Sequence, residues 1–227
     1  MQSPQAVRLN HMPSFIPPLA TILTFALASI VLIITPGPDM ALQLSRSINY
    51  GRAHGMMTFL GTMLGLLVHS ALVALGISIL IVAAPPIFLA LKIVGGVYLL
   101  WLAWQAIRKG GGFRLAAAAK QQPTLWQSFL AGVMIDLLNP KVVLFFVTFL
   151  PQFVHAGDPG APGQLFFLGL EYFMLSLPAG VALVWFATWI TRALTRSKTV
   201  ERVLNWGFAG VFATFAAVIL SAQARHA

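Results

Sequence analysis

The sequence predicts an all-α integral membrane protein with six transmembrane helices arranged as two inverted three-helix repeats. Three observations favour this class. The 227-residue chain is 59% hydrophobic and only 8% charged, its apolar runs are long enough to cross a bilayer, and two of these runs carry proline breaks. Soluble domains have about 25% charged residues, so this chain has too little polar surface to cover a water-soluble globule.

The apolar runs give the expected helices in order. About 20 apolar residues span the hydrocarbon core of a bilayer. Runs of adequate length occupy residues 18–40, 55–82, 86–107, 126–150, 165–190 and 204–223. Prolines, polar loops and basic connections separate them, so each run is expected to cross the membrane once.

These helices form a single transmembrane domain with two halves. The expected parts are an N-terminal segment 1–17, a first repeat 18–107, a basic cytoplasmic loop 108–125 and a second repeat 126–223. The first apolar run carries one of the proline breaks, so it is expected to be retained as a helix and not removed as a signal peptide.

Basic residues in the connections predict the orientation, because cytoplasmic loops are enriched in Lys and Arg. Ten of them follow the first, third and fifth runs: Arg46, Arg52, Arg108, Lys109, Arg114, Lys120, Arg192, Arg196, Lys198 and Arg202. The other side has only Arg8 and Arg225, near the termini. Both termini are therefore expected outside the cell, in the periplasm. All six tryptophans fall at expected helix ends on the basic side, where interfacial tryptophan belongs.

Two of the runs are interrupted by proline in similar local sequences. "IITPGPDM" in the first run and "LLNPKVVL" in the fourth place Pro36 opposite Pro140. Weaker matches follow in the same order, "TFLG" with "FFLG" and "GGVYLL" with "AGVFAT", which indicates two halves of three helices each. Because three is odd, the second half is inverted in the membrane. Inverted repeats with interrupted helices are typical of secondary transporters, and the interruptions indicate the binding site.

The breaks expose backbone groups that a substrate could use. A proline removes an N–H donor and frees a carbonyl in the preceding turn, and irregular backbone survives in a membrane only inside protein or beside water. The half-helix after each break presents N–H groups suited to a carboxylate, while freed carbonyls suit an ammonium group or a proton-carrying water. The expected transport path therefore includes the break residues Thr35, Pro36, Gly37, Pro38, Asn139 and Pro140.

Charged residues near the breaks extend this path. Asp39 is an ordinary N-cap of the second half-helix, a part of the site, or both. Lys141 opposes the dipole at the start of its half-helix, so it needs an anionic partner, either Asp136 or Asp39; a structural salt bridge is the alternative reading. Glu171, near the outer end of the fifth run, either joins the path or reaches the outer interface.

Two stripes of small or polar residues each have two possible roles. His69 lies mid-helix in the second run, on a stripe formed by Thr58, Thr62, Gly65, His69 and Gly76. Such a stripe is typical of close helix packing, whereas histidine titrates near neutral pH and can relay protons. A stripe in the sixth run predicts a packing face, inside the fold or at a homodimer seam: Gly207, Gly210, Thr214, Ala217 and Ser221.

Other function classes find little support. There is no cysteine, and the five histidines are scattered without a metal or nucleophile motif, so no metal, cofactor or enzymatic activity is expected. The net charge of +9 comes without a basic run interleaved with aromatics, so nucleic acid is not an expected partner. A small-ion exporter or channel on a similar scaffold is the alternative to an amino-acid transporter.

The sequence around both breaks resembles the LysE/RhtB family of bacterial amino-acid exporters. Four blocks carry the resemblance in order: "TPGPDMALQLSRSINYGRAHG", "GLLVHSALVALGIS", "LKIVGGVYLLWLAWQAIR" and "LLNPKVVLFFVTFLPQFV". The resemblance implies an inner-membrane secondary transporter that exports amino acids or close derivatives from the cytoplasm by proton antiport. Its partners would be an amino-acid substrate, protons and membrane lipid.

The resemblance also implies site residues. The family's motif positions fall on Pro36, Gly37, Pro38, Asp39, His69, Asn139, Pro140 and Lys141. One residue departs from the pattern, because the family commonly has "NLLNPK", with asparagine where this chain has Asp136. This third deep charge either neutralises Lys141 or favours a cationic substrate or a proton at the site.

Overall fold

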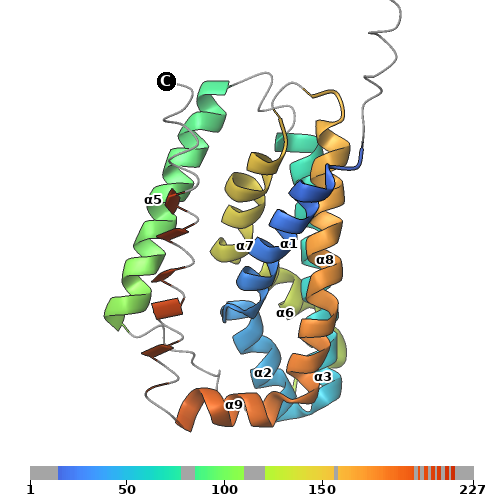
Figure 1. Cartoon of the computed structure of the whole chain (residues 1–227). Helices are drawn as coiled ribbons and strands as arrows, with labels where there is room; N and C mark the ends of the chain where they lie inside the picture. Colours follow the sequence, from blue (N-terminus) through green and yellow to red (C-terminus); the bar gives the residue numbers. More distant parts are fainter. Residues whose placement is uncertain are drawn as a thin grey trace, which may run out of the picture.

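The computed structural model describes residues 15–77, 85–109, 121–155 and 158–196, with scattered positions between 199 and 217. The regular elements in these ranges are all helical (Figure 1). In chain order they are α1 (Leu19–Ile34), α2 (Pro38–Tyr50), α3 (Arg52–Leu72), a π-helical turn η1 (Val73–Ile77), α5 (Pro85–Lys109), α6 (Leu125–Leu137), α7 (Pro140–Leu144), a second π-helical turn η2 (Phe145–Phe149), a 3₁₀ turn η3 (Leu150–Phe153), α8 (Ala161–Trp185) and α9 (Ala187–Arg196).

Several of these helices suit a membrane. Within the described residues, Arg52–Gly76 and α8 are long and apolar enough to cross one, and two bent pairs qualify when each is taken together. The pairs are α1 with α2, bent by 50°, and α6 with Pro140–Phe153, bent by 45°. The described chain thus holds two candidate spans, or four if each bent pair is one span. Large apolar side chains such as Leu27 and Val97 lie exposed along α1 and α5, as expected for surfaces that face lipid.

The predicted breaks and most of the predicted runs are recognisable in these elements. The third run, 86–107, coincides with α5, whereas most of the sixth run, 204–223, lies outside the described residues. The second run begins earlier than expected, since α3 starts at Arg52 directly after Gly51. Gly51 has φ 92°, a left-handed conformation that favours glycine, and it turns the chain between α2 and α3.

The prediction of one helix over 165–190 is wrong at both ends. The helix α8 spans Ala161–Trp185, and α9 is a separate helix that runs across the end of the bundle (Figure 1). Ile190 packs on a small cluster with Leu44 and Leu183, while Trp189 and Arg192 are exposed. Because "ATWITRALTR" is apolar on one side only, it lies along a surface instead of continuing the span.

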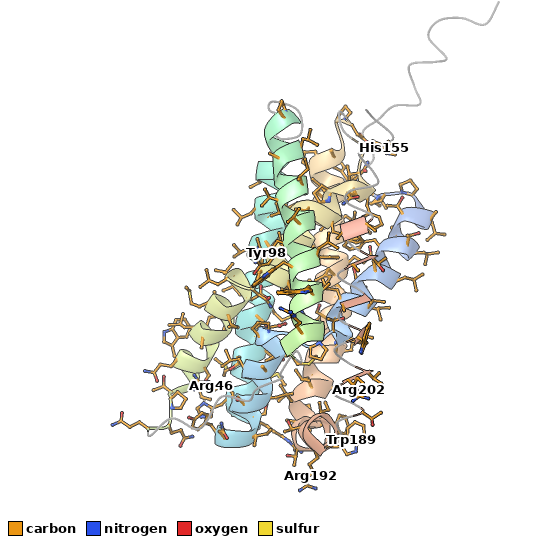
Figure 2. All side chains as sticks on the ribbon, turned by 90° about the vertical axis from the view of Figure 1, so that its left-hand side faces the viewer. Arg46, Tyr98, His155, Trp189, Arg192 and Arg202 are labelled. Carbon is orange, nitrogen blue, oxygen red and sulfur yellow. The ribbon has the colours of Figure 1, made fainter. Side chains whose placement is uncertain are left out.

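Basic and tryptophan side chains gather at the end of the bundle where α9 lies. Figure 2 shows Arg46, Arg192 and Arg202 at this end and His155 at the opposite end. The guanidinium of Arg52 lies 4.7 Å from the centre of the Trp185 ring, a cation–π distance. Most of the basic connection 108–125 lies outside the described residues, and the side of the membrane on which the basic connections lie stays a prediction.

The helices α3 and α6 cross so closely that their backbones touch. A Cβ added at Gly61 would lie 2.8 Å from the backbone nitrogen of Val133, and one added at Gly132 would meet the carbonyl of Thr58. Small residues at a crossing allow this approach in membrane bundles. The predicted packing role of the stripe in the second run is confirmed for Thr58 and Gly65, which lie at this crossing.

Two parts of the predicted stripes do not pack as expected. An added Cβ at Gly76 would have no atom within 4 Å among the described residues. The π-helical turn at Val73–Ile77 explains this, because its wider turn shifts the register of the stripe. In the sixth run, Gly207, Gly210 and Thr214 are exposed in the described fold, so the interior alternative is wrong for these residues and the homodimer seam stays a prediction.

Replacing Gly61 by alanine is expected to destabilise the fold by about 1–3 kcal/mol, because the added methyl overpacks the α3–α6 crossing. Thermal unfolding of the purified protein in detergent measures this loss. Gly76→Ala is the matched control, since an added Cβ at Gly76 meets none of the described residues. Equal melting temperatures for both variants would contradict the close crossing.

Candidate functional site

The two helix breaks meet at the centre of the site. Gly37 is the N-cap of α2 and Asn139 the N-cap of α7, and each is followed by proline as the first helical residue. Proline suits this position because its missing N–H would have no helical partner there. The half-helices therefore begin at Pro38 and Pro140, and the predicted pairing of Pro36 with Pro140 is shifted by two residues. Pro36 lies in the linker between α1 and α2.

Asp39 and Lys141 are the second residues of these two half-helices, and they face each other. Lys141 Nζ lies 3.8 Å from Asp39 Oδ1 and donates a hydrogen bond of 3.0 Å to the carbonyl oxygen of Thr35. The side chain of Lys141 is 6% exposed and that of Asp39 is 21% exposed. The carbonyl that the break frees is thus occupied by a lysine of the other break.

Asn139 completes the connection between the breaks. Its Nδ2 donates to Asp39 Oδ1 at 3.1 Å, and its Oδ1 accepts from the backbone N–H of Lys141 at 3.1 Å. The N-terminus of α7 is therefore capped by its own asparagine, whereas α2 has no side-chain cap. The interpretation of Asp39 as an N-cap is wrong, since Gly37 holds that position and Asp39 lies in the first turn.

Gly37 leaves the space that this contact needs. A Cβ at this position would lie 2.6 Å from Asp39 Oδ1 and 3.0 Å from Lys141 Nζ. The backbone of Gly37 is extended, at φ −146°, so it is the close approach of the ion pair and not the backbone angle that requires glycine.

His69 and Asp136 form a second buried pair beside the first. His69 Nε2 lies 3.9 Å from Asp136 Oδ2, and the histidine ring stacks on Phe146 with centroids 5.5 Å apart. Asp136 is 1% exposed and fits against Gly65, where an added Cβ would lie 2.8 Å from the aspartate Cβ. Asp136 Oδ2 has no hydrogen-bond partner among the described residues. A buried carboxylate oxygen in this state favours the arrival of a proton or a cation.

A cavity of about 60 Å³ lies between α1, α2, α3, α6, α7 and α8. It holds about four water-sized groups. Phe59, Met63, Leu66 and Leu183 contribute to its apolar wall. Its polar lining consists of Asp39, Gln43, Thr62, Asp136, Lys141, Tyr172 and Ser176.

The structure brings most of the predicted site residues together. Three of the predicted charged residues line the cavity, and Thr35 and Asn139 bond directly to two of them. His69 contacts Asp136 without lining the cavity. Glu171 lies on α8 outside the cavity lining, and its Oε2 is buried without a hydrogen-bond partner among the described residues. A role for Glu171 in the path stays a prediction.

Sequence reasoning missed Gln43 and assigned Thr62 only to helix packing. Gln43 is one helical turn after Asp39 on α2, so the two residues share a face of the helix. A polar residue on that face is the sequence feature that could have indicated a role in the site. Tyr172 and Ser176, on α8, also line the cavity. They follow Glu171 in the sequence, but the neighbouring positions of a helix point in different directions.

Comparisons with known proteins match most of the chain. A family model described as "LysE type translocator" matches residues 30–223. The homoserine/homoserine lactone efflux protein of Salmonella typhimurium is 29% identical, over 89% of this chain and 96% of that protein. The leucine efflux protein of Enterobacter sp. is 25% identical, over 87% and 94%. An uncharacterized membrane protein of Pseudomonas aeruginosa is 34% identical, over 68% and 70%. No solved structure gives a significant match.

Proposed function

The chain belongs to the LysE type translocator family, a family of membrane efflux transporters and not of enzymes, and we propose that it exports amino acids or close derivatives from the cytoplasm across the bacterial inner membrane. The observation that carries the proposal is the cavity beside two helix breaks that an ion pair joins. Relatives named for the efflux of homoserine, homoserine lactone and leucine support this class of cargo.

The proposed architecture has six spans in two inverted repeats. The equivalent places of the pairs Pro38–Asp39 and Pro140–Lys141, each at the start of a half-helix, support the repeat. We place the termini in the periplasm, because Arg46, Arg192 and Arg202 gather at one end of the bundle (Figure 2), which would be the cytoplasmic end, and the predicted basic connections follow the first, third and fifth runs. A homodimer seam along the exposed stripe at Gly207 and Gly210 belongs to the same proposal.

Alternating access then depends on the contact between the breaks. In this arrangement the ion pair and Asn139 hold α2 and α7 together on one side of the cavity. Substrate binding would compete for these polar groups, weaken the contact and let the two half-helices separate. Proton antiport would use the buried pair His69 and Asp136, which adjoins the cavity and takes up a proton as the substrate leaves.

Efflux from proteoliposomes tests this proposal. Vesicles are loaded with labelled homoserine, leucine and other amino acids, and an acidic exterior is imposed so that protons can enter as substrate leaves. Right-side-out and inside-out vesicles are compared to determine direction. The proposal expects one or a few amino acids to leave faster than from protein-free vesicles, with a rate that depends on the pH gradient. Movement of inorganic ions without any amino acid would support the small-ion alternative instead.

A further inference from the structure

We propose that the α-ammonium group of the substrate binds between Gln43 Oε1 and Asp136 Oδ2, and that the transporter requires this ammonium group, and not the carboxylate, of its substrate. The inference rests on the proposed function of the cavity and names the group by which it selects. Both oxygens belong to residues that line the cavity. Neither has a hydrogen-bond partner in the part of the chain that the structure describes.

The orientation of the Gln43 amide is fixed by its neighbour. Gln43 Nε2 donates to Thr62 Oγ1 at 3.2 Å, and that hydroxyl donates its own proton to the carbonyl of Phe59 at 2.7 Å. A hydroxyl has one proton, so Thr62 can only accept from the amide, and the nitrogen of Gln43 must face it. The oxygen Oε1 is therefore the atom left over. Gln43 is 5% exposed, so little bulk water reaches this oxygen.

The two oxygens are held close together by α3. The Gln43 amide is fixed at Thr62, and Asp136 Oδ2 lies against Gly65, three residues further along the same helix. Three residues correspond to about 4.5 Å along a helix axis. An ammonium group carries three N–H donors and bonds oxygens at about 2.9 Å, so one such group can reach both acceptors.

The charges of the cavity lining favour an ammonium group over a carboxylate here. The lining has two acidic side chains, Asp39 and Asp136, and one basic side chain, Lys141. The lysine is already directed to the Thr35 carbonyl and to Asp39, and Asn139 Nδ2 also donates to Asp39. An arriving carboxylate therefore meets a cation whose charge Asp39 already balances, while an arriving ammonium meets two acceptors that have no hydrogen-bond partner among the described residues. The apolar wall at Phe59, Met63 and Leu66 is left for the substrate side chain.

Competition in a transport assay tests the inference. The probe is labelled leucine, or homoserine if only that is exported, in counterflow by reconstituted full-length protein. One competitor keeps the ammonium and blocks the carboxylate (leucinamide, or homoserine lactone). The other keeps the carboxylate and lacks the ammonium (4-methylpentanoate, or 4-hydroxybutanoate). The wild-type protein is expected to accept the first competitor and to ignore the second even at 100-fold excess.

Variants of Gln43 then locate the recognition. Gln43→Leu is expected to raise the concentration of each ammonium-bearing ligand needed for half-inhibition by about 10–100-fold, the loss of one hydrogen bond to a charged group. Gln43→Glu keeps an acceptor and is expected to retain binding. The matched control is Gln152→Leu, because Gln152 Oε1 is also buried without a hydrogen-bond partner among the described residues, and Gln152 does not line the cavity.

The outcomes separate this inference from the proposed function. Inhibition by the carboxylate competitor equal to that by the ammonium competitor overturns the inference while efflux itself stands. The same shift for Gln43→Leu and Gln152→Leu, or millimolar Na⁺ displacing substrate in a Gln43-dependent way, overturns it as well. Absence of efflux for every labelled amino acid overturns the proposed function and the inference together. Thermal unfolding of each variant shows that the protein tested is folded.

Discussion

Efflux is expected to fall about 100-fold when Lys141 is replaced by methionine. The change leaves Asp39 beside the break without its cation and removes the hydrogen bond to the Thr35 carbonyl. Breaking one side of a buried ion pair costs about 3 kcal/mol or more, because the remaining charge stays in an environment of low polarity. The same energy corresponds to about 100-fold in an equilibrium between conformations. Proteoliposome efflux at a fixed pH gradient measures the effect.

A double variant separates transport from folding in this experiment. Lys141→Met with Asp39→Asn removes both charges, so the melting temperature is expected to recover part of the loss caused by the single variant. Transport is expected to stay low, since the polar contact between α2 and α7 is gone. Arg192→Met is the control, because this cation is exposed on α9. Recovery of efflux in the double variant would show that the pair only stabilises the fold.

Replacement of Asp136 by asparagine is expected to remove the dependence of efflux on the pH gradient while counterflow of substrate persists at a reduced rate. Asparagine is nearly isosteric and has no proton to exchange, so a step that requires a proton at this position is lost. The variant is also expected to be at least as stable as the wild type, because a neutral amide costs less to bury than an ionised carboxylate.

Two measurements check this prediction. Efflux rates with and without an acidic exterior are compared for the wild type and Asp136→Asn, and thermal unfolding reports the change in stability. Asp158→Asn is a suitable control, since Asp158 pairs with Gly160 and Gln164 in a loop away from the cavity. If efflux by Asp136→Asn still responds fully to the gradient, the prediction is contradicted and another residue carries the coupling proton. Glu171 would then be the next residue to replace.

The breaks and their charges could be predicted because they conflict with local rules. A proline inside an apolar run and a cation at the start of a helix are both costly, so the sequence itself indicates that Lys141 needs a partner. Asp39 was one of the two partners expected, and the structure pairs them at 3.8 Å. Sequence alone could not choose between Asp39 and Asp136, since the choice depends on how the two halves pack.

The missing parts depend on details that leave no periodic signal. In the sequence, Pro36 and Pro38 are equally plausible first residues of a half-helix. Only the structure shows that α2 begins at Pro38. The site role of Gln43 depends on which way its amide points, and that is decided by the hydroxyl of Thr62 on another helix. The prediction that Gly76 lies on the packing stripe failed for a similar reason. It assumed a regular α-helix, and the periodicity of the sequence does not reveal the extra residue of the π-helical turn.

The two π-helical turns pack against each other, one beyond the α3 part of the site and the other beyond the α7 part. A π turn holds one residue more than an α-helical cycle requires. Releasing that residue would rotate the following segment by about 100°, the angle per residue of an α-helix. In the described chain η3 follows η2 directly, so such a change would rotate Leu150–Phe153 relative to α7, while Lys141 at the start of α7 keeps its place.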